Sequence, residues 1–183
     1  SSPSVHSAIG KLAGVTGIVC NILLFLGKLA AGILSGSVSI IADAVNNLSD
    51  ASSSLVTLLG FRMAQQPADR DHPYVIAALI LLIGADLAKS SAEKILHPED
   101  VAFSAVTFAI LLCSIAVKIW MALFFASLGR RIRSTTLRAT SVDSRNDVIT
   151  SSAVLAGCLV NYFLDINIDG WVGLAVAIFI LYS

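Results

Sequence analysis

Charged side chains are scarce in this sequence, and the two signs balance. Only 13% of the 183 residues are Asp, Glu, Lys or Arg, and the 12 basic and 12 acidic residues give a formal net charge of +0. Because nucleic-acid binding needs a broad basic field, nucleic acid is excluded as a partner. The three cysteines stand alone in apolar runs without CxxC spacing, and no glycine-rich phosphate loop occurs.

Apolar residues are correspondingly abundant. Hydrophobic residues make up 56% of the chain and the mean hydropathy is +0.85, which is typical of a polytopic membrane protein. A membrane-spanning helix needs about 20 mostly apolar residues. We therefore expect an all-α membrane protein, a bundle of six transmembrane helices over residues 15–34, 38–63, 75–96, 103–128, 141–164 and 170–183.

The third of these spans is short at its start. Its apolar run, Val75 to Ala88, would rise only about 21 Å, less than the hydrocarbon core of about 30 Å. We therefore expect that residues are missing between Tyr74 and Val75.

Basic residues in the connections between spans predict the orientation. Arg130, Arg131, Arg133 and Arg138 lie between the fourth and fifth spans, and Arg70 lies between the second and third. Short loops rich in Lys and Arg face the cytoplasm. We expect a multi-pass protein of the cell membrane with both termini in the cytoplasm.

Two pairs of oxygen-bearing side chains lie inside predicted spans at the same spacing. Asn46 and Asp50 are four residues apart in the second span, and Asp143 and Asp147 are four apart in the fifth. This spacing puts both members of a pair on one helical face. A single intramembrane Asp can cap a helix, pair with Lys or face water, but each uncompensated charge costs roughly 2.5–3.5 kcal/mol. Two matched pairs therefore predict a cation site.

The donor atoms indicate which cation this site prefers. Neither pair contains His or Cys, and oxygen donors suit Mn²⁺, Mg²⁺ or Ca²⁺ better than Zn²⁺. Carboxylates still accept zinc, so the ligand set disfavours zinc without excluding it.

Other intramembrane polar residues have more than one interpretation. Asp43 lies three residues before Asn46 and is either a group that supports a ligand of the site or lines its entrance, or a hydrogen-bonded structural residue. Lys28, Asp86 and Lys118 are expected to form inter-helix pairs or to extend toward the membrane surface, a structural role.

Three segments together resemble the cation diffusion facilitator family. They are 36-GSVSIIADAVNNLSDASSSLVTLLGFRMAQQPADRDHPY-74, 89-KSSAEKILHPE-99 and 143-DSRNDVITSSAVL-155. The resemblance implies a homodimeric exporter with six spans that moves divalent metal ions in exchange for protons. By motif position it assigns the transport site to Asn46, Asp50, Asp143 and Asp147, and the NxxxD and DxxxD pairs are similar to the bacterial manganese-exporting branch.

The sequence departs from the family pattern in two places. A GHGRxE-like stretch normally follows HPY but is absent after Tyr74, which leaves only Asp69 and His72 as possible ligands of an accessory metal site. The resemblance also implies a cytoplasmic C-terminal domain, which we expect to be absent from this chain.

The combined prediction is a Mn²⁺/H⁺ antiporter in the lipid bilayer that works by alternating access. It is not an enzyme and needs no cofactor, because the divalent metal and the protons are its cargo. A Zn²⁺ or Fe²⁺ exporter of the same family is the first alternative. An intramembrane aspartate-dependent hydrolase is the second, but its GxGD context does not occur in the sequence.

Overall fold

A computed structural model describes residues 2–63 and 72–182 of the chain, and this described part is built of α-helices. The helices are α1 (Pro3–Ser35), α2 (Val38–Met63), α3 (His72–Leu96), α4 (Ala105–Arg131), α5 (Thr135–Leu164) and α6 (Asp169–Tyr182). The predicted all-α bundle of six helices is therefore confirmed, and each predicted span falls largely within one helix.

Four described helices are long and apolar enough to cross a membrane: α1, the Tyr74–Leu96 part of α3, α4 and α5. Helix α6 is apolar but shorter. Helix α2 is not among the four, because Asp43, Asn46, Asn47 and Asp50 lower its hydropathy. The chain is thus a multi-pass membrane protein, while the exact limits of its six spans stay a prediction.

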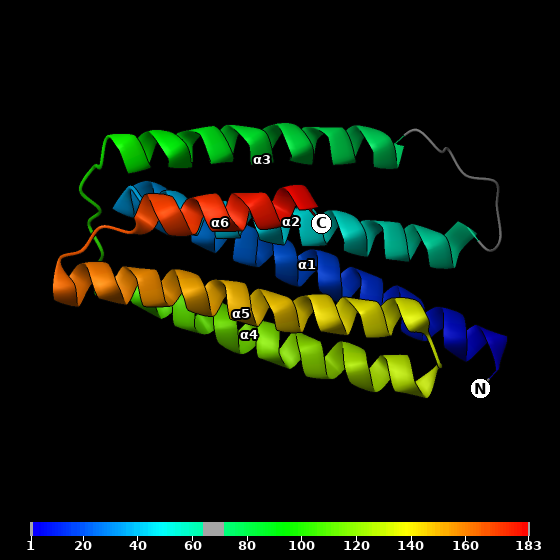
Figure 1. The fold of residues 1–183 in the computed structure, drawn as a ribbon. Coiled ribbons are helices and arrows are strands. Elements are labelled where there is room, and N and C mark those ends of the chain that lie inside the picture. Colours follow the sequence, from blue (N-terminus) through cyan, green and yellow to red (C-terminus); the bar gives the residue numbers. More distant parts are fainter. Residues whose placement is uncertain (1, 64–71, 183) are drawn as a thin grey trace.

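The helices run roughly along one direction (Figure 1), with α3 on one side, α4 and α5 on the other, and α1, α2 and α6 between them. Helix α1 packs against α2 and α4, α5 packs against α4, and α6 packs against α3 and α2. One end of the bundle holds the N-terminus and the arginine-rich α4–α5 connection, and we call it the basic end. The α1–α2, α3–α4 and α5–α6 connections lie at the opposite end.

Local sequence signals set several helix boundaries. Ser2, Ser104 and Ser134 precede α1, α4 and α5, and each side chain accepts a hydrogen bond from a backbone N–H of the first turn. Such caps satisfy donors that have no partner within the helix. Gly36 ends α1 with φ of 71°, a left-handed conformation that favours glycine. The tight turn that results lets α2 begin two residues later.

Asp169 of α6 holds three helices together at the opposite end. One carboxylate oxygen accepts a hydrogen bond from the backbone N–H of Val38 at 2.8 Å, and the other accepts one from the Ser39 hydroxyl at 2.6 Å. Lys94 of α3 forms an ion pair with the same carboxylate at 3.2 Å. Asp169 therefore caps α2 from a neighbouring helix, and a buried anion at a helix N-terminus also complements the helix dipole.

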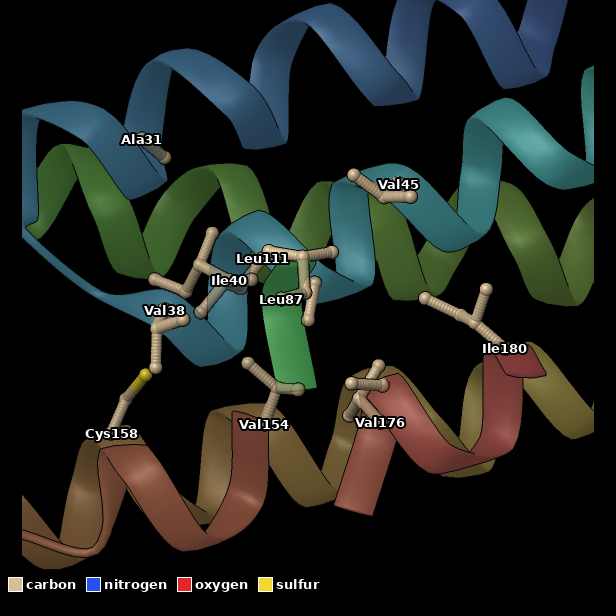
Figure 2. Packing of buried hydrophobic residues seen from close by; sticks show 12 residues of the cluster. Ala31, Val38, Ile40, Val45, Leu87, Leu111, Val154, Cys158, Val176 and Ile180 are labelled. Atoms are coloured by element: carbon tan, nitrogen blue, oxygen red, sulfur yellow. The ribbon is translucent and has the colours of Figure 1, made fainter. Parts of the chain in front are cut away.

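The main apolar cluster surrounds the first turns of α2. Figure 2 shows Val38, Ile40 and Val45 of α2 with Leu111 of α4, Val154 of α5 and Val176 and Ile180 of α6, all of them buried. Large apolar side chains are in contrast exposed on the outer surfaces of the helices, for example Leu23, Leu82 and Leu123. This distribution fits a bundle surrounded by lipid rather than water. The predicted polar pairs of α2 and α5 lie closer to the basic end than this cluster does.

Candidate metal centre

The two helices with predicted pairs meet through Asn46 and Asp147. The amide nitrogen Nδ2 of Asn46 donates a hydrogen bond to Oδ1 of Asp147 at 2.8 Å. Both side chains are buried, with exposed fractions of 3% and 2% for the two residues. One member of each pair therefore lies at the contact between α2 and α5.

A lysine of a third helix lies between the pairs. The ammonium nitrogen Nζ of Lys118, in α4, donates to Oδ2 of Asp50 at 3.0 Å and to Oδ2 of Asp147 at 2.8 Å. Its third hydrogen bond goes to Oδ1 of Asn21, in α1, at 2.6 Å. Lys118 is fully buried, with an exposed fraction of 0%. Helices α1, α2, α4 and α5 thus converge on one ammonium group.

Asp143 lies at the open side of this cluster. It is exposed to solvent, one helical turn before Asp147 and closer to the basic end. A cavity of about 290 Å³ is lined by both predicted pairs and by Ser49, Ser53, Asn146 and Phe179. All four predicted site residues therefore border one polar cavity, although Asp143 makes no hydrogen bond to the other three within the described part of the chain.

The arrangement differs in two ways from a finished metal coordination shell. No group of three His, Cys, Asp or Glu side chains within residues 2–63 and 72–182 is placed to hold a metal ion. Asn46 also presents its amide nitrogen to Asp147, whereas a metal ligand must present the amide oxygen. Rotation of this amide by half a turn exchanges the two atoms. The carboxylates here converge on Lys118 in place of a metal ion.

Asp43 belongs to a separate buried ion pair. Its Oδ2 lies 3.0 Å from Nζ of Lys28 in α1 and accepts a hydrogen bond from the Ser151 hydroxyl in α5 at 2.9 Å. Lys28 also donates to Ser151 at 3.0 Å. Of the two roles considered for Asp43, the structure favours the structural one, at a level of the bundle closer to the opposite end. Asp86 is exposed on α3.

The possible accessory metal ligands cannot be placed. Asp69 lies outside the described residues, and His72 starts α3 but its side chain is outside the described part. Their metal binding stays a prediction.

A larger cavity, of about 430 Å³, lies between α2, α3 and α6. Its lining is formed by apolar side chains and three serines, Ser49, Ser52 and Ser53, and includes no acidic residue. A cation in this space would have no compensating charge. The smaller, acidic cavity is therefore the candidate metal centre.

Comparison with known families gives a match to the cation efflux transmembrane domain over residues 15–74 and 75–183. The chain belongs to this family. The predicted membership of the cation diffusion facilitator family is thereby confirmed, as is the fold class. The match has two parts that meet between Tyr74 and Val75, the junction where we expect missing residues, and that expectation stays a prediction.

Curated proteins similar to this chain come from archaea and bacteria. An uncharacterized transporter of Methanocaldococcus jannaschii is 29% identical over 177 residues, which cover 91% of this chain and 62% of the relative. The cation-efflux pump FieF of Salmonella typhi is 26% identical, covering 98% and 64%. The manganese efflux system protein MneS of Bacillus subtilis is 26% identical, covering 84% and 57%. The chain spans less than two thirds of the length of these relatives.

Sequence reasoning missed two residues of this cation efflux domain that contact the predicted site. Lys118 was expected to have a structural role, and Asn21 was not singled out. Both interrupt apolar runs, VKIW in α4 and VCNILL in α1, and polar groups at such depth need partners. That signal could have identified them as buried, but it could not have shown which helix supplies the partners.

Proposed function

We propose that the chain is the membrane domain of a divalent metal cation exporter, with Mn²⁺ as the favoured substrate and protons as the counter-ion. The observation that carries this proposal is the polar cavity bordered by Asn46, Asp50, Asp143 and Asp147 inside the bundle. In lipid, three carboxylates around one cavity need compensation by cations or protons. A divalent cation supplies that compensation, and protons compete for the same oxygens.

Access to the cavity is from the basic end. Its lining residues on α2 extend from Asn46 to Ser53, and those on α5 extend back to the exposed Asp143. On the other side of the site, the interior is filled by the Lys28–Asp43 pair and the fully buried Ile40 and Ala44, which close the cavity toward the opposite end. Since arginine-rich connections face the cytoplasm, this arrangement corresponds to a site open to the cytoplasm. Export then requires a second arrangement that opens the opposite end.

The oxygen-only donor set supports Mn²⁺ over Zn²⁺. Asn46 replaces a possible fourth carboxylate with a neutral amide, which lowers the negative charge of the site and eases release of the ion. The name of the Bacillus subtilis relative, a manganese efflux system protein, points the same way. Most sites bind Mn²⁺ more weakly than Zn²⁺. The preference of this site is therefore tested by measuring Mn²⁺ uptake while Zn²⁺ competes with it.

Transport by the reconstituted chain tests the assignment. Vesicles with an internal metal-sensitive dye and an imposed pH gradient should take up Mn²⁺, and Asp147→Asn or Asp50→Asn should reduce the initial rate at least about tenfold, because each removes one charged ligand. Asp86→Asn is the matched control: it neutralises an exposed Asp on a different helix and should leave the rate unchanged. Full-rate uptake by the Asp147→Asn variant would refute the site.

Competition between metals tests the substrate. Mn²⁺ uptake measured with increasing Zn²⁺ or Fe²⁺ should persist at equimolar competitor. If equimolar Zn²⁺ suppresses Mn²⁺ uptake and is itself transported faster, the protein is a zinc exporter. We further propose a homodimer in the cell membrane with cytoplasmic termini, which crosslinking and accessibility labelling of the reconstituted chain can test.

A further inference from the structure

The position of Lys118 relative to the carboxylates is the observation that the function above leaves unexplained. An ammonium group has three N–H donors, and all three of Lys118 are used, by Asn21, Asp50 and Asp147. The two carboxylate oxygens that it contacts are Oδ2 of Asp50 and Oδ2 of Asp147. A cation supplied by the protein therefore already holds two of the proposed ligands.

A metal ion that binds these two carboxylates meets the ammonium at the same two oxygens. A divalent ion lies roughly 2.0–2.2 Å from each ligand oxygen, and Nζ of Lys118 lies 3.0 and 2.8 Å from the same two oxygens. A metal ion bound to both oxygens would therefore lie at most about 5 Å from Nζ. Because two positive charges so close together repel strongly in a low-dielectric site, the two cations compete for these carboxylates.

Asn21 offers the ammonium a place to remain. Its Oδ1 accepts the shortest hydrogen bond of the three, 2.6 Å, and it is buried at 2% exposure on α1, a helix that carries none of the proposed metal ligands. A neutral amide oxygen can hold an ammonium group but adds no negative charge that would attract the metal. Small rotations of the flexible lysine side chain can turn Nζ away from the carboxylates while it keeps its hydrogen bond to Asn21, without moving a helix.

We propose that Lys118 is a tethered cation that competes with the transported metal for Asp50 and Asp147, and that Asn21 retains its ammonium while the metal is bound. This inference rests on the proposed transport function and concerns the affinity of the same site. It makes Lys118 a residue that weakens metal binding and thereby speeds release, since removing the metal returns the ammonium to the carboxylates.

The second buried lysine of the bundle provides an internal comparison. Lys28 is as buried as Lys118, but it faces a single carboxylate, Asp43, and a serine hydroxyl. Lys118 faces two carboxylates beside a cavity that holds a third, Asp143. Of these two described clusters, that of Lys118 has acidic groups in excess of its lysine, which is the condition for a further cation to bind.

Calorimetric titration of the purified full chain with Mn²⁺ alone tests this proposal. Lys118→Met keeps the length of the side chain but removes the competing charge, so the Kd for Mn²⁺ should fall at least about tenfold. Lys118→Arg keeps the charge and can engage both carboxylates more firmly, so its Kd should rise at least about tenfold. Asn21→Leu removes the retaining oxygen and should raise the Kd, whereas in the Lys118→Met background it should change nothing.

The matched control is Lys28→Met combined with Asp43→Asn, which removes the other buried cation with its partner and should leave the Kd within about twofold. A Kd for Lys118→Met that is unchanged or higher would overturn the proposal and make Lys118 a positioning residue. An unchanged Kd for Lys118→Arg would also overturn it, and this variant keeps the buried charge that folding needs. If the parent chain itself shows no Mn²⁺ binding that Asp147→Asn abolishes, the proposed function fails instead.

Discussion

The Lys28–Asp43 pair allows a quantitative prediction of stability. Both side chains are excluded from solvent, and Nζ lies 3.0 Å from Oδ2. At an effective dielectric constant of about 20, charges at this distance attract by about 5.5 kcal/mol, and desolvation of the two groups offsets part of that. Lys28→Met removes the attraction but leaves a buried carboxylate whose Oδ1 already has no hydrogen-bond partner in the described structure.

We therefore expect Lys28→Met to reduce the free energy of unfolding by about 3–5 kcal/mol, the usual cost of breaking one partner of a buried pair. Adding Asp43→Asn should restore most of this loss, because the neutral amide can still accept the Ser151 hydrogen bond and no charge remains uncompensated. Reversible unfolding in mixed detergent micelles, followed by circular dichroism, measures both values. A Lys28→Met variant within about 1 kcal/mol of the parent would refute the reasoning, as would a double variant less stable than the single one.

Three further predictions concern packing, capping and the counter-ion. A methyl group at Gly173 would lie 2.8 Å from the Ser91 hydroxyl oxygen and from a methyl of Val38. Gly173→Ala should therefore destabilise the bundle by about 1–3 kcal/mol. Gly27→Ala is the control and should be neutral or stabilising, because the nearest atom to its added methyl group lies at 3.9 Å. Asp169→Ala removes the cap of α2 and should cost about 1–3 kcal/mol, measured in the same unfolding assay, whereas a loss below about 0.5 kcal/mol would show that water replaces the cap. Collapse of the pH gradient with an ionophore should slow Mn²⁺ uptake by the reconstituted chain, and an undiminished rate would show that protons are not exchanged.

The helices of this fold could be predicted from the sequence because each one has its own local signal. Apolar runs predicted five helices directly, although the third run is shorter than a full span, and the serine caps and Gly36 lie at helix ends. Helix α2 was predicted from its apolar flanks although its centre is polar, and the structure confirms a continuous helix over Val38–Met63. Helix boundaries depend on neighbours in the chain, which a sequence displays.

The site could be predicted only in part, because its remaining members depend on contacts between distant segments. The spacing of Asn46 with Asp50 and of Asp143 with Asp147 identified which residues share a face. It could not show that Lys118 of α4 and Asn21 of α1 would reach the same point, since 68 residues separate Lys118 from Asp50 and 97 separate it from Asn21. The same limit left the partner of Asp43 open until α1 was placed against α2.

The two buried lysines belong to two polar clusters of the interior. In one cluster the charges balance, and in the other negative charge is in excess. In the first cluster one ammonium pairs with one carboxylate, both with side-chain exposure of 1% or less. Their formal charges cancel without any added ion. In the second, one ammonium contacts two carboxylates beside a cavity lined by a third, Asp143, and Asp50 keeps a side-chain exposure of 20%. Three carboxylates against one ammonium leave a formal charge of minus two, which a single divalent cation neutralises while Asn21 holds the Lys118 ammonium close by. A monovalent cation would leave one charge uncompensated in lipid, at a cost of several kcal/mol. The tethered lysine therefore favours divalent over monovalent ions by charge balance, while the oxygen ligands decide among the divalent ones.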